Sequence, residues 1–529
     1  MKNNFIKQTT TYIAAIAVTL GAVSCSKLDE QVYGSKSVAT ASTGTATADL
    51  NSVYGQLNQL SGQYGWHALQ VHSTDELLGP TRGTDWDDFG TWRKIHLHAT
   101  DGAHNQIYDT WNGLNGALFQ ATLVAEKSTG AAQAEGKFLR AFFATQVMDI
   151  YGQVPYRAAA DGPDKIPSVK TRSEAFDWIM KDVDDAIAGL PTFGTGSDMH
   201  KANKQAAQFL KARLLLNKAV YKADPKTPTT FTFAAADMTE VITLVDAINA
   251  SGKFSLSTGY WDNFKWDNYQ KSTELILSRA SNGPGNKTQT GGNTGVTWAT
   301  GMGTHYNQAF SGWNGFTTTA DFYNSFKIDS SGFDVTRDQR RNADLAGATE
   351  IHGFTAGFMA GQQYKYDGGK KVEVKDRSGG KLVFTPDVSL FFSTESKGIR
   401  TNKYPLKGDQ LGFNEENEFV IFRFADALLM KAEALVRTSK AADALVIVNN
   451  IRKRAGTTSL TAVTLNDVIA ERGRELYLEG SRRTDLIRFG KYNDPVNERP
   501  IKSDGFRVVY PIPNQAVSSN PNLKQNFGY

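Results

Sequence analysis

Apolar residues recur every three or four positions in long segments of this chain, which is the spacing of a helix that buries one face. Thr171, with Glu174 three residues later, predicts a capped helix start. The pair Tyr151-Gly152 predicts a helix end, and Thr464 is the expected N-cap of the last long segment. The predicted helices cover residues 50–60, 105–127, 138–150, 172–189, 203–220, 234–250, 421–437, 441–455 and 465–488. Such helices, joined by short loops, favour antiparallel pairs in a helical-repeat scaffold.

The middle of the chain has a different pattern. Residues 281–303 are rich in Gly, Asn and Thr with few apolar positions, which predicts a long loop. Within residues 350–415, short β-like pieces at Val372–Val374 and Leu382–Thr385 lie between glycine pairs. Long loops on a rigid scaffold often carry binding groups.

The N-terminal residues 1–24 are typical of an export signal. A basic start at Lys2 and Lys7 precedes an apolar run from Tyr12 to Val23. The run is too short for a transmembrane helix, which needs about 20 apolar residues, and it matches a secretory signal. Ser24 before Cys25 resembles a bacterial lipobox, so we expect a lipoprotein signal peptide over 1–24 and an acylated Cys25. The alternative is ordinary signal cleavage that leaves Cys25 unmodified.

Composition and charge exclude several classes of protein. The chain has 529 residues and a single Cys, which excludes a disulfide framework and a cysteine-based zinc cluster. Its 58 Lys and Arg against 54 Asp and Glu give a net charge of +4, too balanced for a protein that follows the phosphates of a nucleic acid. We therefore expect no nucleic-acid partner.

The motifs of the C-terminal third, and two in the N-terminal half, are the basis of a family resemblance. They are Phe422–Ala434, Val448–Gly456, Glu471–Gly480, Asp485–Lys491, Tyr510–Pro513, Asn520–Asn526, Gly136–Phe142 and Tyr151–Pro155. Taken in their order along the chain, these motifs resemble the SusD/RagB family of outer-membrane nutrient-binding lipoproteins of Bacteroidetes. The resemblance extends over nearly all of residues 25–529.

This resemblance implies an all-α fold with about four tetratricopeptide-like helix pairs and an irregular, loop-rich ligand-binding region. The SusD-like domain would span residues 25–529, with the helical scaffold mainly at 45–280 and 416–490 and a loop-rich insertion at 281–415. The implied partner is a SusC-like TonB-dependent transporter in the outer membrane, to which the protein passes a glycan. Ser26–Glu30 also resembles the short acidic tag that directs such lipoproteins to the outer face of the cell.

Four of the nine Trp residues lie between positions 66 and 111, and one of them is in a polar loop. Sugar rings have apolar C–H faces and hydroxyl groups, so proteins bind them with an aromatic plate beside charged groups of fixed direction. Trp86, flanked by Arg82, Asp85 and Asp87, meets that need. The alternative is a half-buried loop Trp without a ligand. Trp111, on the apolar side of its predicted helix, is expected in the core.

A second aromatic stretch, His305–Phe316, follows the glycine-rich segment. By resemblance, the family's glycan site combines an early aromatic loop with a later loop of this kind. We therefore expect Trp86 and Trp313 to form the ligand site, with polar contributions from Asp75, Arg82, Asp85, Tyr306 and Asn314.

Enzyme and metal chemistry find little support in the sequence. Glu475 and Glu479 are one helical turn apart, but the neighbouring arginines would hold both ionised and leave no proton donor, which favours structural ion pairs. His96 and His98 would supply only two ligands of a zinc site, and the Asp85–Asp88 loop lacks an EF-hand pattern. We expect neither catalysis nor a cofactor.

The sequence thus predicts a surface-exposed lipoprotein that captures an oligo- or polysaccharide and delivers it to a transporter. Two alternatives stay open: capture of a peptide or glycopeptide for uptake, and a structural transporter subunit that binds no ligand.

Overall fold

The computed structural model describes residues 46–62, 64–162, 164–195, 198–226, 231–281, 296–326, 338–408 and 416–529. All of them belong to one unit, Thr45–Tyr529. The expected signal peptide over 1–24, Cys25 and residues 282–295 of the expected long loop lie outside the described residues. No helix of the described ranges is both long enough and apolar enough to cross a membrane.

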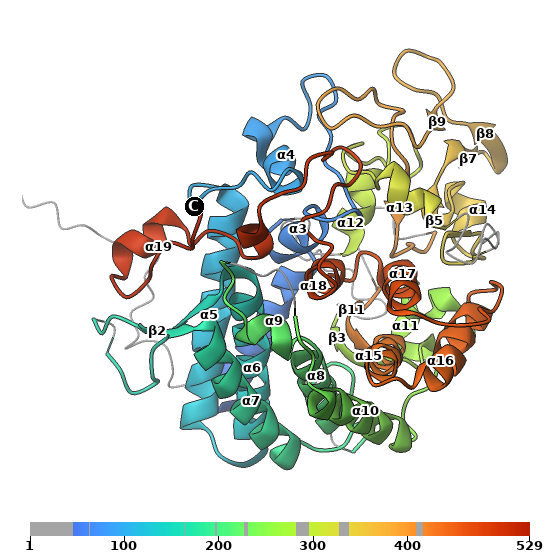
Figure 1. Cartoon of the computed structure of the whole chain (residues 1–529). Helices are drawn as coiled ribbons and strands as arrows, with labels where there is room; N and C mark the ends of the chain where they lie inside the picture. Colours follow the sequence, from blue (N-terminus) through green and yellow to red (C-terminus); the bar gives the residue numbers. More distant parts are fainter. Residues whose placement is uncertain are drawn as a thin grey trace, which may run out of the picture. The chain divides into compact units, whose positions relative to one another are not determined.

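Long helices make up the scaffold, as expected. They are α5 (Asn105–Lys127), α6 (Gly130–Tyr151), α7 (Arg172–Gly189), α8 (Lys204–Leu216), α10 (Ala235–Ala250), α15 (Phe424–Arg437), α16 (Ala441–Arg454) and α17 (Leu465–Leu476). Each packs against the next in the order α5, α6, α7, α8, α10 and α15, and α15 also contacts α16 and α17 (Figure 1). Only Ser128 and Thr129 separate α5 from α6, so this pair must run antiparallel. The prediction of an all-α fold built from helix pairs is confirmed.

Local signals set several helix ends. Thr171 accepts a hydrogen bond from the backbone N–H of Glu174, and the Glu174 carboxylate accepts one from the Thr171 N–H, the predicted capping box of α7. Thr464 and Asp467 form the same box at α17. Helix α6 ends at Gly152, whose φ of 71° is in the left-handed region that glycine tolerates.

Three predicted helices differ from the structure. Residues 421–423 belong to strand β11 (Phe419–Arg423), which pairs with β3 (Leu275–Arg279). Both strands are almost entirely buried, and a short continuous apolar run cannot be told from a helix by periodicity. The segment 203–220 is interrupted at Asn217, and 465–488 breaks after Leu476. The second break follows from positive φ angles at Leu478 and Gly480.

The remaining elements are short. They are α2 (Ala46–Gly55), η1 (Gln56–Leu60), α3 (Trp66–Val71), η2 (Asp88–Gly90), α4 (Thr91–His96), β1 (Gln153–Tyr156), β2 (Ser168–Thr171), α9 (Lys218–Lys222), η3 (Tyr260–Asn263), α11 (Asn268–Lys271), α12 (Val296–Gly303), α13 (Ala320–Asn324), β4 (Asn342–Ala343), α14 (Thr349–His352), β5 (Ala356–Met359), β6 (Gly361–Gln362), β7 (Tyr364–Asp367), β8 (Lys370–Glu373), β9 (Val383–Phe384), β10 (Arg400–Asn402), α18 (Arg482–Arg488), η4 (Gly505–Val508) and α19 (Asn514–Ser519).

The expected loop-rich insertion contains more regular structure than predicted. Helix α12 replaces the last part of the expected loop over 281–303. The two predicted β-like pieces are confirmed in position, since one overlaps β8 at residues 372–373 and the other contains β9. Strands β7 and β8 form a hairpin whose turn is Gly368-Gly369, both with positive φ. A three-stranded sheet has the order β10-β5-β4.

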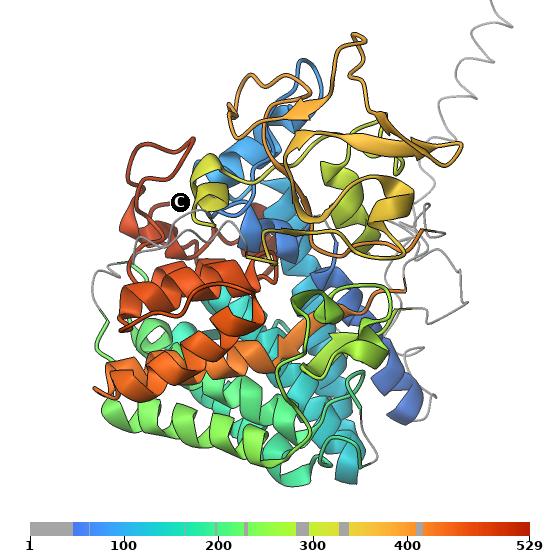
Figure 2. The same cartoon turned by 90° about the vertical axis from the view of Figure 1, so that its right-hand side faces the viewer.

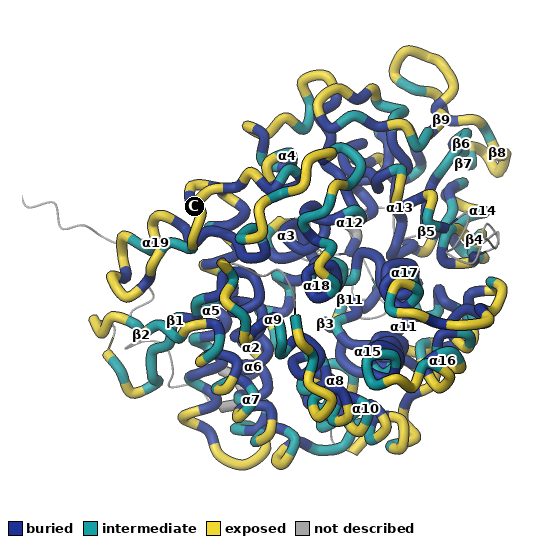
Figure 3. Tube along the Cα trace, in the orientation of Figure 1, coloured by how far each residue is buried: buried dark blue, intermediate teal, exposed yellow. Residues whose placement is uncertain are grey.

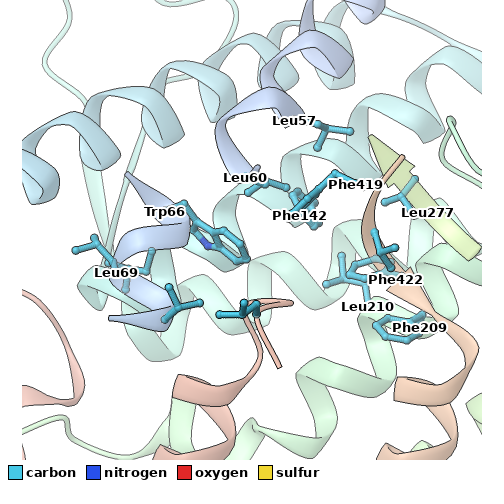
Figure 4. Packing of buried hydrophobic residues seen from close by; sticks show 14 of the residues in the cluster. Leu57, Leu60, Trp66, Leu69, Phe142, Phe209, Leu210, Leu277, Phe419 and Phe422 are labelled. Atoms are coloured by element: carbon cyan, nitrogen blue, oxygen red, sulfur yellow. The ribbon is translucent and has the colours of Figure 1, made fainter. Parts of the chain in front are cut away.

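The insertion and the scaffold share one hydrophobic core. Phe422 of β11 lies between Phe142 of α6 and Phe209 of α8, with ring centroids 5.8 and 4.4 Å away (Figure 4). In the insertion, Phe358 of β5 stacks on Tyr477 at 5.3 Å. Most residues of α15 and β11 are buried, whereas the β7–β8 hairpin is largely exposed (Figure 3).

The N-terminal and C-terminal segments are interlocked. Residues of α3 and α4 and those near positions 497–510 exchange hydrogen bonds: Tyr510 Oη donates to Leu69 O at 2.8 Å, and Arg499 Nη1 donates to His96 O at 2.9 Å. Figure 2 shows the red C-terminal segment beside the blue N-terminal helices. The loop that follows α3 is therefore supported by the last part of the chain.

Candidate functional site

The loop that carries Trp86 is held in a strained conformation. Trp86, Asp88 and Phe89 have backbone φ angles of 65°, 41° and 55°. Residues other than glycine seldom adopt such positive values. Asp88 accepts a hydrogen bond from Trp92 Nε1 at 2.7 Å, and Asp87 pairs with Arg93 at 2.5 Å. Strain of this kind persists where the surroundings enforce it, and it is concentrated at functional sites.

Trp86 and Trp313 are brought together, as the family resemblance implied. The segments that carry them are aligned by an antiparallel bridge between Leu78 and Thr317. Trp86 Nε1 donates a hydrogen bond to Trp313 O at 3.0 Å, and the Trp313 side chain is 36% exposed. A Cβ at position 315 would lie 2.5 Å from the Trp86 ring, so Gly315 is what allows that ring to lie against the second loop.

Arg82 lies beneath this pair and is 4% exposed. Its guanidinium donates to three carbonyl oxygens, those of Gly315 (3.2 Å), Thr394 (2.5 Å) and Lys397 (2.9 Å). Burial lowers the pKa of Arg82 to about 9. Arg82 therefore ties three loops together, and its depth keeps it from a ligand at the surface.

Asn314 is also brought to the site but is fully buried. Its φ is 52°; its Nδ2 donates to Glu395 O at 3.1 Å, and its Oδ1 accepts from Arg400 Nη2 at 2.8 Å. Because the Asn314 Nδ2 and Oδ1 atoms both form hydrogen bonds within the protein, Asn314 holds the turn next to Trp313 in place.

Asp85 and Tyr306 supply polar groups at the surface beside the tryptophans. Tyr306 Oη donates to Asp85 Oδ2 at 3.3 Å, and burial together with the Asp85 charge raises the pKa of Tyr306. Arg377 stacks over the Tyr306 ring at 4.8 Å and pairs with Glu395 at 3.0 Å. His305 Nε2 shares the Glu395 carboxylate at 2.9 Å. The group offers hydrogen-bond donors and acceptors of fixed direction.

Sequence reasoning missed Arg377, Glu395 and two exposed phenylalanines. The Arg377 side chain is 59% exposed, and Phe89 and Phe392 are 96% and 89% exposed. Ser393 N donates to Thr81 O at 2.9 Å, which joins the segment after Phe392 to the start of the Trp86 loop. No periodicity pointed to these residues, although Arg377 and Glu395 lie in the predicted loop-rich insertion.

Asp75 is the one expected site residue that the structure does not bring to the others. Its carboxylate pairs with Arg482 of α18, Oδ1 to Nε at 2.8 Å and Oδ2 to Nη2 at 2.6 Å. Burial alone would raise the pKa of Asp75, but attraction to Arg482 outweighs it and holds that pKa below its usual range. The side chain is thus occupied by the scaffold.

The residues weighed for other chemistry have structural partners. Trp111 is buried, as predicted. His96 uses both ring nitrogens on the carbonyls of His72 and Asn497, and no cluster of metal-ligating side chains occurs within the described ranges. Glu475 and Glu479 are bound by Arg423 at 2.7 and 2.6 Å, which confirms structural ion pairing, although the partner is a distant arginine and not one of those expected beside them in sequence.

The chain is similar in sequence to known proteins. Residues 273–529 match the model of the SusD family. The chain is 26% identical over 453 residues to the starch-binding protein SusD of Bacteroides thetaiotaomicron, an alignment that covers 78% of this chain and 75% of that protein.

Solved structures share the fold. A SusD-like protein of Bacteroides fragilis superposes with a TM-score of 0.68 at 20% identity, covering 92% of this chain and 96% of that one. Surface glycan-binding protein A of Bacteroides thetaiotaomicron, solved in complex with laminarihexaose, gives a TM-score of 0.61 at 19% identity, with 91% and 98% covered.

Proposed function

The chain belongs to the SusD family, and from this premise we propose that it is a surface glycan-binding protein. It captures an oligo- or polysaccharide without altering it. The observation that carries the proposal is the junction of Trp86 and Trp313, held by the 3.0 Å hydrogen bond from Trp86 Nε1 to Trp313 O. Relatives named for starch binding and glycan binding support the same ligand class.

The proposed mechanism combines stacking with directed hydrogen bonds. The tryptophan rings contact the apolar C–H face of a sugar. Asp85, Tyr306 and Arg377 bond its hydroxyl groups, since all three are at least partly exposed beside the rings. Arg82 and Asn314 hold the loops in place from below.

The wider assignment follows from the family resemblance and from the N-terminal sequence. Residues 1–24 act as a lipoprotein signal peptide and Cys25 carries the lipid, which anchors residues 25–529 at the outer membrane. The ligand passes to a SusC-like TonB-dependent transporter. The protein has no catalytic role in this scheme.

The test is affinity electrophoresis of the full chain against a panel of polysaccharides. Trp86→Ala and Trp313→Ala should each weaken retardation about tenfold, because burying an aromatic side chain contributes roughly 1.5–3 kcal/mol and about 1.4 kcal/mol is a factor of ten in affinity. Trp266→Ala is the control, since Trp266 is also partly exposed but lies outside both loops.

Two results would contradict the proposal at different points. Retardation by no glycan would reject glycan capture and leave peptide capture or a purely structural subunit. Retardation that stays the same in both tryptophan variants would reject the site and keep the function.

A further inference from the structure

A cleft of about 650 Å³ lies on the helical scaffold, and it shares no residue with the Trp86–Trp313 site. It is formed by the start of α7, the end of α9, the β1–β2 hairpin and residues 506–527. Clefts of 300–1,000 Å³ are the size that holds small ligands.

Positive charge dominates the lining of this cleft. Arg172, Lys222, Lys226 and Lys524 line it, with Asp224 as the lining carboxylate. Lys222 pairs with Asp177 at 2.6 Å, so its positive charge is partly neutralised. Lys226 and Lys524 have no carboxylate within 4.0 Å in the described part of the chain.

Arg172 is an unusual member of the lining because it is 4% exposed. Its Nη1 donates to Val220 O at 3.3 Å, and its guanidinium lies 5.1 Å from the centre of the Tyr221 ring. Its Nε and Nη2 find no acceptor among the described residues. Buried N–H groups without a partner are costly, so an acceptor bound in the cleft beside them would be stabilised.

The first turn of α7 adds to the positive potential. The capping box uses the backbone N–H groups of Thr171 and Glu174, and Arg172 and Ser173 are the next donors of the turn. The N-terminus of an 18-residue helix carries a partial positive charge that favours anions.

One wall of the cleft is apolar. Val169, Val509, Phe506 and Phe527 line it, and Phe527 is 59% exposed. An exposed phenyl ring beside cationic groups suits a ligand with both a charge and an apolar ring face. A bare inorganic ion would leave this wall unused.

We propose that the cleft binds an organic anion, namely a carboxylate or sulfate group carried on a sugar ring. Arg172, Lys226, Lys524 and the start of α7 hold the acidic group, and Phe527 packs on the ring. The proposal does not depend on the function of the Trp86–Trp313 site.

The test is calorimetric titration of the full chain with glucuronate and with glucose 6-sulfate, which distinguishes the two acidic groups. Glucose, inorganic sulfate and the dipeptide Glu-Glu are the comparison probes. We expect saturable binding of at least one acidic sugar, weakened by added salt because the attraction is between charges. In the double variant K226A/K524A affinity should fall at least about tenfold, since hydrogen bonds to charged groups are lost.

The matched control is K440A/K453A, which removes the same charge from exposed lysines outside the cleft. Arg172→Lys keeps the charge but not the guanidinium, and it should weaken binding while circular dichroism stays native. The proposal is overturned if neither acidic sugar binds, if K226A/K524A binds like the parent, or if glucose, sulfate or Glu-Glu binds as tightly.

Discussion

Trp86 adopts a conformation that depends on one neighbouring glycine. Its φ of 65° places the indole against Gly315, where the ring atoms leave no room for a methyl group. The ring also packs on Phe316 with centroids 5.2 Å apart. The position of the Trp86 ring, the proposed contact surface for a sugar, therefore depends on Gly315 as much as on Trp86 itself.

Gly315→Ala should displace the Trp86 ring, because the added Cβ would lie 2.5 Å from it. We expect glycan retardation to fall about tenfold, close to the loss in Trp86→Ala, with a shift in tryptophan fluorescence. Gly116→Ala is the control: it lies in α5 with open space around its Cβ, so it should leave binding unchanged and stabilise the helix by up to ~1 kcal/mol. Normal retardation in Gly315→Ala would show that the ring position is not needed.

Glu76 is a second residue whose surroundings matter, because they change the pKa of its carboxyl group. It is 1% exposed, and neither carboxylate oxygen has a hydrogen-bond partner among the described residues. Burial raises the pKa of Glu76 well above its usual value. An acid whose pKa is raised in the folded state stabilises the fold below its unfolded pKa, near 4.3, and that contribution is lost as pH rises.

Glu76→Gln removes this ionisation. We expect the variant to match the parent near pH 4 and to exceed its free energy of unfolding by about 1.4 kcal/mol at pH 8 for each unit by which the pKa is raised. Urea denaturation of both proteins across this pH range measures the difference. Parallel stability curves would mean that Glu76 is ionised in the folded protein.

At the scale of elements, α17 is the point where the loop-rich insertion is fastened to the scaffold. Arg340, from the insertion, pairs with Asp338 (2.6 Å), Glu471 (2.6 Å) and Glu475 (3.0 Å), and all four side chains are fully buried. Burial would raise the pKa of Glu471, but the attraction of Arg340 and its neighbours lowers it to about 2. Because the pKa of Glu471 is lowered in the folded state, its carboxylate stabilises the folded protein above about pH 4.5, and this contribution is lost as the pH falls toward 2.

Arg340→Met should destabilise the protein by roughly 3–5 kcal/mol, because it leaves buried carboxylates without their partner. The free energy of unfolding in urea measures the loss. Lys165→Met is the control, since the Lys165 side chain is 65% exposed and its pair with Asp161 should contribute less than about 1 kcal/mol. An equal, small effect of both substitutions would rule out this role for Arg340.

At the scale of the molecule, structural features that depend on neighbouring residues could be predicted from the sequence. Features that depend on contacts between distant segments could not. The cap at Thr171 and the stop at Gly152 gave the helix ends correctly, because each depends on a few neighbouring residues. The strand at 421–423 was missed because its pairing partner, β3, is about 145 residues away. The meeting of Trp86 and Trp313 was expected only through the family resemblance, and Glu395 and Arg377 beside them gave no signal.

The interlocked ends of the chain have a consequence for how the protein folds. His96 is bonded to a residue 401 positions later, and Leu69 to one 441 positions later. Contacts of such high sequence separation raise the contact order, and their loop-closure entropy must be overcome before they stabilise anything. We therefore expect the scaffold helices to form early, and helices α3 and α4, which flank the Trp86 loop, to reach their final positions after the C-terminal segment has docked.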